Sequence, residues 1–163
     1  MHFAKATPPP AFHAAGWWWA PLLLGLLNAA LAVTQLASFE DFRAILEAYG
    51  FIPNAWSATV ALGIAAFEIL SLPVLLRLSL SPAMRTVSMY AVLAAPTAWI
   101  KLSIAATATG NGASESGLFG SFVVVNADML PFLSFVHLLV SVGVLYVFGL
   151  SGLAPRLKKK RRT

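Results

Sequence analysis

The segment AWSATVALGIAAFEILSLPVLL, residues 55–76, contains one ionisable side chain, Glu68, in an otherwise mainly apolar run. A helix needs about 20 mainly apolar residues to cross the hydrocarbon core of a bilayer, and this segment meets that length. Residues 17–37, 86–108 and 129–150 have the same character. The sequence therefore predicts an all-α membrane protein, a bundle of four transmembrane helices.

The composition of the whole chain agrees with this fold class. Its 163 residues are 59% hydrophobic and only 10% charged, and its mean hydropathy is +0.80. Soluble domains average about 25% charged residues, so we predict a single membrane domain at residues 17–151. The chain contains no cysteine, which excludes a disulfide framework, a thiol relay and a cysteine-bound metal within it.

The charged residues predict the orientation in the membrane, because basic residues stay on the cytoplasmic side during insertion. The tail at residues 152–163 and the connection around Arg77 and Arg85 are basic. The other two connections are mainly acidic, with Glu40, Asp41 and Glu47 against Arg43 in the first, and Glu115 and Asp128 in the third. We therefore predict a bacterial inner-membrane protein with both termini in the cytoplasm.

The two ends of the chain carry separate predictions. The basic residues of the tail are Arg156, Lys158, Lys159, Lys160, Arg161 and Arg162. Such a cluster beside a membrane helix favours anionic lipid over nucleic acid, since no basic face with interleaved aromatic residues accompanies it. A signal peptide has a basic start and a short apolar core. Residues 1–16 carry too little positive charge for such a start, and the apolar run that follows is too long for such a core. We predict a cytoplasmic N-terminal segment.

The first outer connection predicts a short amphipathic helix. Apolar side chains recur at helical spacing, at Phe39, Phe42, Ile45, Leu46 and Tyr49. Ser38 precedes them as a candidate N-cap, and Gly50 follows as a left-handed stop. This helix is either a simple connector or a docking element. In the third connection, residues 118–125 predict a re-entrant or surface-lying segment, with Asn126 or Asp128 capping the last helix.

Three ionisable side chains fall inside the predicted spans: Glu68, Lys101 and His137, with Asn28 near the middle of the first span. Such groups are costly in hydrocarbon and are functional candidates by default. At a rise of 1.5 Å per residue, Lys101 and His137 lie about 10 and 12 Å from the outer ends of their helices, and Glu68 about 20 Å. We therefore predict an intramembrane polar cluster in which Glu68 pairs with Lys101 and His137 lies nearby.

Other interpretations of these residues stay open. Lys101 could extend its long stem to the outer interface. His137 could be a structural hydrogen-bond donor between helices, and Glu68 a protonated packing residue. A proton path or a quinone site would use all three. No second histidine on another span supports a haem or metal site, and no catalytic constellation is visible, so we predict a protein that is not an enzyme.

The sequence SFEDFRAILEAYGFIP, residues 38–53, resembles the first outer loop of the methylamine-utilisation protein MauE and its DoxX-like relatives. In that family an aromatic and glycine-containing stretch ending in proline joins the first two helices, and the next helix carries a glutamate, as Glu68 does here. The resemblance covers most of the chain. It implies an accessory or maturation factor that serves a periplasmic redox enzyme of the methylamine-dehydrogenase type.

One departure from the family bears on function. Many MauE-like sequences have a Cys-Gly-Cys-Phe-Gly motif in the second outer loop, whereas the matching stretch here is ESGLFG at residues 115–120. Both cysteines are missing, so this loop cannot exchange thiols. The resemblance then implies a docking role for the outer loops, carried by Phe39, Phe42, Tyr49, Phe119 and Gly120. The alternative is a small structural subunit of a quinone-linked or energy-converting membrane complex. No cofactor is predicted, although the alternative would allow a quinone.

Overall fold

The computed structural model describes residue 6 and residues 18–109, 116–123 and 125–147. The helices in chain order are α1 (Ala20–Ala37), α2 (Phe39–Ala48), α3 (Asn54–Leu75), α4 (Pro82–Thr109), the short 3-10 helix η1 (Ala127–Met129) and α5 (Leu130–Val147). Over these described ranges no strand forms, and Phe119 and Val123 make an isolated bridge. The protein is all-helical where it is described.

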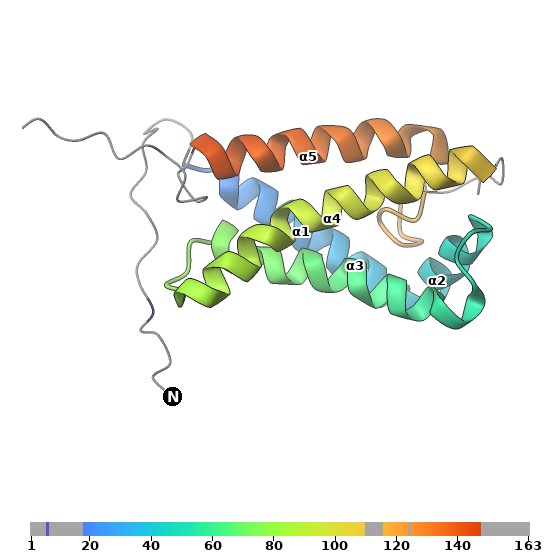
Figure 1. Cartoon of the computed structure of the whole chain (residues 1–163), viewed down its shortest axis with the longest axis horizontal. Helices are drawn as coiled ribbons and strands as arrows, with labels where there is room; N and C mark the ends of the chain where they lie inside the picture. The colour runs from blue at the N-terminus through green and yellow to red at the C-terminus, as the bar shows by residue number, and fades with distance from the viewer. Residues whose placement is uncertain (1–5, 7–17, 110–115, 124, 148–163) are drawn as a thin grey trace, which may run out of the picture.

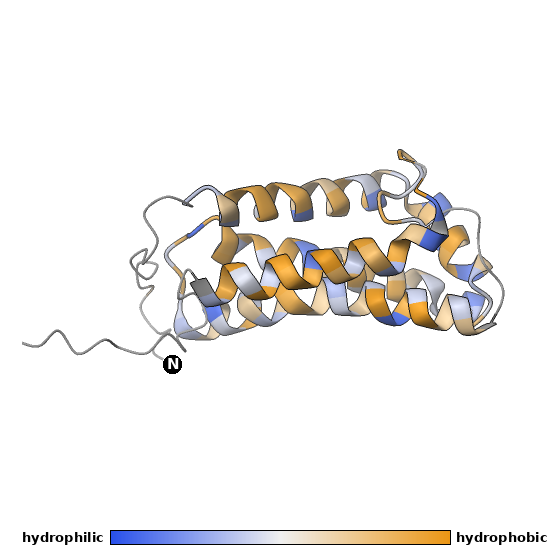
Figure 2. Cartoon of the chain, turned by 90° about the horizontal axis from the view of Figure 1, so that it is seen from above, coloured by the Kyte–Doolittle hydropathy of each residue, from blue (hydrophilic) through white to orange (hydrophobic). Residues whose placement is uncertain are grey.

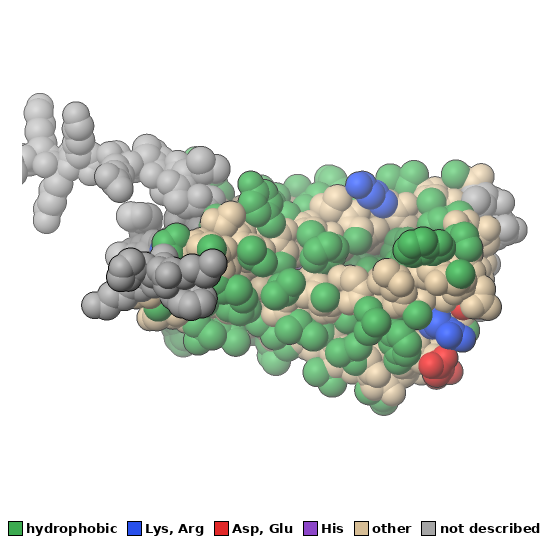
Figure 3. All heavy atoms as spheres, turned by 60° about the horizontal axis from the view of Figure 1, so that its bottom comes forward, with side chains coloured by type: hydrophobic (Ala, Val, Ile, Leu, Met, Phe, Trp, Pro, Cys, Tyr) green, Lys and Arg blue, Asp and Glu red, His purple; other side chains and the backbone are tan. Residues whose placement is uncertain are grey.

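Helices α1, α3 and α4 are long and apolar enough to cross a membrane, and α5 is a shorter apolar helix. Large hydrophobic side chains are exposed along them, among them Leu26, Leu62, Tyr90 and Leu139. Figure 2 shows that hydrophobic residues dominate the long helices, and Figure 3 shows one face covered mainly by hydrophobic side chains. Such a surface suits lipid rather than water, which indicates a membrane protein.

The helices do not pack equally against one another. Helix α3 packs along both α1 and α4, and α4 packs along α5, whereas α1 and α5 make few contacts. Figure 1 shows α2 at one end of the molecule and the α3–α4 connection at the other. The interface between α1 and α5 is therefore the loosest long interface of the bundle.

Two hydrophobic cores lie at the two ends of the bundle. The core beneath α2 contains large side chains that are fully buried, including Phe42, Leu46, Tyr49 and Trp99. The phenyl ring of Phe42 lies 5.9 Å from the ring of Trp99, centroid to centroid. The second core gathers Leu24, Val74, Leu75, Leu80, Val92, Val144 and Leu145. Because α2 places Phe42 and Leu46 in the first core, its apolar stripe faces the protein.

Local sequence signals explain two of the helix ends. Gly50 has a φ of 77° just after α2, the left-handed conformation that favours glycine. Ser81 accepts a hydrogen bond from the Met84 N–H (3.3 Å) at the start of α4. The capping role expected for Ser38 is wrong, because its hydroxyl makes no cap bond to α2 and donates instead to the Thr34 carbonyl (2.9 Å).

Candidate functional site

Glu68 lies in the middle of α3 and is fully buried. Its Oε1 accepts hydrogen bonds from Gln35 Nε2 on α1 (3.1 Å) and from Trp99 Nε1 on α4 (3.4 Å). One carboxyl group therefore ties three helices together. Buried polar groups in a bundle need such partners, because hydrocarbon offers none.

The expected pairing of Glu68 with Lys101 is wrong. Lys101 is exposed on α4, and the side chain that reaches Glu68 from this helix is Trp99. Two residues further along a helix of 3.6 residues per turn corresponds to a rotation of about 200°, so Lys101 faces nearly the opposite way. Depth in the membrane placed the two charges within about two helical turns of each other, but the rotation about the helix axis points them in different directions.

Gln35 and Trp99 are functional candidates that the sequence analysis did not include. Gln35 Nε2 donates both to Glu68 and to the Leu118 carbonyl (3.0 Å). The signal for Gln35 was its position seven residues after Asn28, two helical turns along the same face of α1. The signal for Trp99 was weaker, because an indole N–H is easily read as part of an apolar ring.

Asn28 belongs to a second set of hydrogen bonds, one level further along the same interface. Its Nδ2 donates to Ser71 Oγ (2.7 Å), and Ser71 Oγ donates to the Glu68 carbonyl (2.6 Å). Ser88 on α4 donates to the Ser71 carbonyl (3.3 Å) and accepts from the Val74 N–H (3.1 Å). The predicted polar residues Asn28 and Glu68 therefore lie in one structural network across α1, α3 and α4.

A turn formed by residues 116–123 closes one end of the bundle, next to α2. We call α2 and this turn together the cap. The Tyr49 hydroxyl donates to the Ser116 carbonyl (2.6 Å), the Ser121 N–H donates to Ser38 Oγ (3.0 Å), and the Ser121 hydroxyl donates to Asp41 Oδ2 (2.8 Å). Burial raises the pKa of the Tyr49 phenol to about 12. The turn is thus fixed at several points to α2 and its neighbours.

Two glycines permit this close approach. Gly120 has a φ of 58°, and a Cβ at this position would overlap the Ser38 hydroxyl and lie 2.8 Å from the Thr34 carbonyl oxygen. Gly117, with a φ of 66°, packs in the same way against Ile45 and Phe42. The backbone of the turn therefore sits directly on the junction of α1 and α2.

This geometry corrects the docking assignment of the outer loops. Phe42 and Tyr49 are fully buried and Gly120 is also buried, so a direct contact with a partner through these three residues is wrong. They hold the cap on the bundle instead. Phe39 and Phe119 are half-buried and pack against the same core. The segment predicted as re-entrant or surface-lying is a compact turn whose Leu118 is buried and whose Phe122 and Val123 are exposed.

His137 lies on α5 and faces a cavity between α5 and α1 rather than Glu68 or Lys101. Its Nε2 has no hydrogen-bond partner in the described part of the chain. The described residues contain no group of three His, Asp or Glu side chains that could hold a metal ion. The basic residues predicted for lipid contact, Arg156, Lys158, Lys159, Lys160, Arg161 and Arg162, lie outside the described residues.

Comparisons with protein families, with curated proteins and with solved structures give no match for this chain. The resemblance to MauE and DoxX-like proteins therefore stays a hypothesis carried by the loop sequence and Glu68. The structure shows a buried polar network, a cap held by hydrogen bonds and a loosely packed interface between α1 and α5.

Proposed function

We propose that this chain is an accessory membrane protein that crosses the bilayer four times and holds a partner protein at its cap. The observation that carries the proposal is the cap itself: a turn and a helix far apart in sequence are joined by hydrogen bonds from Tyr49 and Ser121. A preformed surface loses little conformational entropy on binding, so it suits docking.

The exposed side of the cap differs from its buried side. The Glu40 side chain is 76% exposed and pairs with Arg43 (3.4 Å), and Asp41 is also exposed. Phe122 is 64% exposed close to Ser121, which bonds Asp41. Carboxylates beside an exposed aromatic ring match a partner with an apolar anchor point and a basic rim, since aromatic residues supply much of the binding energy and charges guide the encounter.

The fourth crossing rests on α5. Its 18 described residues make a helix about 27 Å long at 1.5 Å per residue, close to the ~30 Å hydrocarbon thickness. The charge distribution supports the same topology: Glu40 and Asp41 lie at the cap end, and Arg77 lies in the connection at the other end. The cap then faces the periplasm under the positive-inside rule.

The absence of cysteine makes topology directly testable, because single cysteines can be introduced without background labelling. With a membrane-impermeant maleimide, we expect Glu40→Cys to react in intact spheroplasts. Leu78→Cys and Thr163→Cys should react only after permeabilisation. Labelling of Thr163→Cys from outside would show an odd number of crossings and contradict the four-helix arrangement.

Site-specific photo-crosslinking tests the docking role. Benzoylphenylalanine at Phe122 should give a discrete crosslinked product in native membranes, and Glu40→Lys should reduce its yield because it reverses a charge on the same surface. Tyr146, 69% exposed on α5, is the matched control and should not give that product. The same product in equal yield from Tyr146, or none from Phe122, would reject the cap as a docking surface.

A second function, a structural subunit of a larger membrane complex, is favoured by the position of Lys101. Lys101 lines a groove of about 410 Å³ on the outside of α3 and α4, together with Phe67 and Tyr90. A cation facing hydrocarbon is costly unless it reaches the interface or finds a partner. A neighbouring transmembrane helix with a carboxylate would provide one. Loss of a co-purifying membrane subunit on Lys101→Met, with no crosslinked product from Phe122, would support this function over the first.

A further inference from the structure

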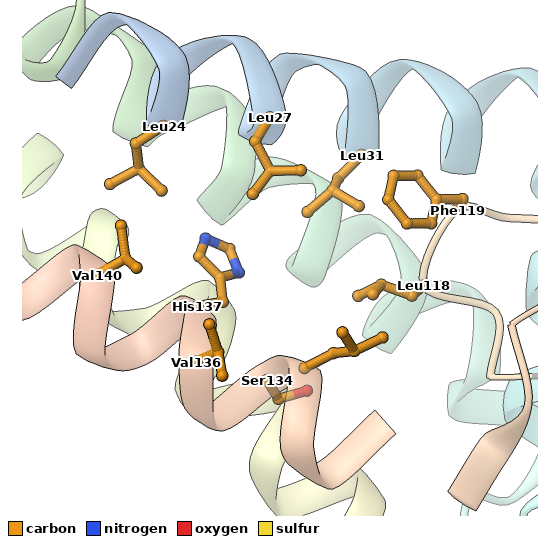
Figure 4. A pocket seen from close by; sticks show the side chains of 10 residues that line it. Leu24, Leu27, Leu31, Leu118, Phe119, Ser134, Val136, His137 and Val140 are labelled. Atoms are coloured by element: carbon orange, nitrogen blue, oxygen red, sulfur yellow. The ribbon is translucent and has the colours of Figure 1, made fainter. Parts of the chain in front are cut away.

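The loose interface between α1 and α5 contains a cavity of about 220 Å³. Leucine and valine side chains from both helices form most of its wall, and Leu118 and Phe119 of the cap close one end. Figure 4 shows these side chains converging from α1, α5 and the turn. The cavity is therefore apolar, and it lies between two of the helices that we place in the membrane.

Two polar groups interrupt this wall, both from α5. His137 is 8% exposed and its ring extends from α5 toward α1 (Figure 4). Ser134, one turn earlier and 1% exposed, also lines the cavity. Neither His137 Nε2 nor Ser134 Oγ has a hydrogen-bond partner among the described residues. Other buried atoms are also unpaired, among them Asn28 Oδ1, Glu68 Oε2 and Ser141 Oγ, but the lining of this cavity includes none of these residues. Since nearly all buried polar atoms are paired, two unpaired atoms in the wall of one cavity point to a ligand there.

The size and shape of the cavity limit what that partner is. An apolar cavity of about 150 Å³ holds one benzene ring, so this one has room for a single substituted ring. Leu27, Val136 and Val140 line it and are also 37%, 40% and 47% exposed. These residues leave a way out to the lipid for an apolar tail. A water molecule fits less well, because it needs two to four polar partners and most of the cavity wall is apolar.

We propose that the α1–α5 cavity binds a lipid-soluble ring that carries carbonyl oxygens, as a quinone does, with His137 and Ser134 as its hydrogen-bond donors. The tautomer with a proton on Nε2 donates to one ring oxygen, and the Ser134 hydroxyl donates to the same or a neighbouring oxygen. Leu118 and Phe119 cover the ring from the cap side. The proposal concerns binding alone and does not depend on a partner at the cap.

The test uses the full chain in nanodiscs and two probes with the same tail: decylubiquinone and decylbenzene. We expect decylubiquinone to raise the melting temperature, and decylbenzene, which has no ring oxygens, to have much less effect. His137→Leu, which replaces the imidazole by an apolar side chain of similar size, should weaken decylubiquinone binding about tenfold, the effect of roughly one hydrogen bond. Val142→Leu, on an exposed part of α5, is the matched control and should bind like the wild type.

A second variant guards against a change in folding. Leu27→Trp places a larger ring at the cavity mouth, on a lining side chain that is 37% exposed, so the bundle should fold while the probe is excluded. Weaker binding in His137→Leu and loss of binding in Leu27→Trp, with the melting temperature of the free protein kept, support the site. Equal binding of the two probes, binding unaffected by Leu27→Trp, or no binding of decylubiquinone would each overturn it.

Discussion

Two interfaces of the same bundle treat buried polar side chains differently. Between α1, α3 and α4, Glu68 and Asn28 bond to side chains on neighbouring helices, although one oxygen of each is unpaired in the described structure. Between α1 and α5, His137 and Ser134 line a cavity, and their unpaired Nε2 and Oγ atoms bond to no neighbouring helix in the described structure. The first interface is closely packed and the second is loose.

The difference shows that a polar residue in a membrane helix is not by itself evidence of a ligand site. At Glu68 the neighbours satisfy Oε1 and the helices pack around it, so the group joins helices. At His137 the facing helix α1 contributes only leucine side chains to the cavity wall, so the imidazole stays available to a ligand. Packing around the polar atom, rather than its chemical type, separates the two roles.

The largest expected effect tests this contrast with matched substitutions. Glu68→Leu removes the acceptor for Gln35 and Trp99, and we expect it to lower the free energy of unfolding by about 3 kcal/mol, because buried donors are left unpaired. His137→Leu should change it by less than about 1 kcal/mol, since no partner loses a bond. Unfolding in mixed micelles, followed by circular dichroism, gives both values.

Glu68→Gln is the control for this pair, because its amide oxygen can still accept from Gln35 and Trp99. We expect it to retain most of the stability that Glu68→Leu loses. If His137→Leu destabilised the protein as much as Glu68→Leu, the α1–α5 interface would depend on a bond from His137, and the contrast between the two interfaces would fail.

A smaller effect is expected at the cap, where a substitution can disrupt the close approach of the turn backbone to the end of α1. Gly120→Ala should cost about 2 kcal/mol, because a left-handed conformation is unfavourable for alanine and the new Cβ meets the Thr34 carbonyl. The readout is the thermal midpoint together with protease cleavage within residues 116–123, which should increase.

Gly63 provides the matched control on α3, since a Cβ there meets nothing within 4 Å. Gly63→Ala should be neutral or should stabilise the helix by up to about 1 kcal/mol. Equal midpoints for the two alanine variants would mean that the turn is not held against Ser38 and Thr34.

The sequence alone was sufficient for the long helices and for part of the polar network. Apolar length indicated where α1, α3 and α4 run, and the glycine at position 50 indicated where α2 ends. Depth along the helices suggested that Glu68 and Lys101 meet, but depth does not determine rotation about a helix axis. That rotation, which presents Trp99 and turns Lys101 outward, is decided by packing against α3.

The attachment of the turn at residues 116–123 to α1 and α2 was the part that the sequence could not predict. Its bonds join residues 67 to 83 positions apart, as in Tyr49 with Ser116 and Gln35 with Leu118. Local propensity carries no information about such pairs, and the apolar run at residues 118–125 is as compatible with a surface segment as with a turn. The cavity depends in turn on this placement, because Leu118 and Phe119 close it.

The smallest expected effect concerns the bond between Tyr49 and Ser116, which belongs to the cap and not to either interface. Tyr49→Phe keeps the ring in the core and removes only the hydroxyl. We expect a loss of about 1 kcal/mol in the free energy of unfolding at neutral pH, the usual contribution of one hydrogen bond. Thermal unfolding measured beside the wild type gives this difference.

The pH dependence of the same pair distinguishes the bond from a general packing effect. Burial raises the pKa of Tyr49 to about 12 from its ordinary value of 10. The unfolded chain therefore releases this proton at lower pH than the folded chain, and the stability is fully present below pH 10 and falls as the pH rises toward 12. Tyr49→Phe should remove this part of the alkaline loss, so the two curves should converge between pH 10 and 12. Parallel curves across that range would mean that the Tyr49 hydroxyl is not buried against the turn, and the cap would then be open at this point.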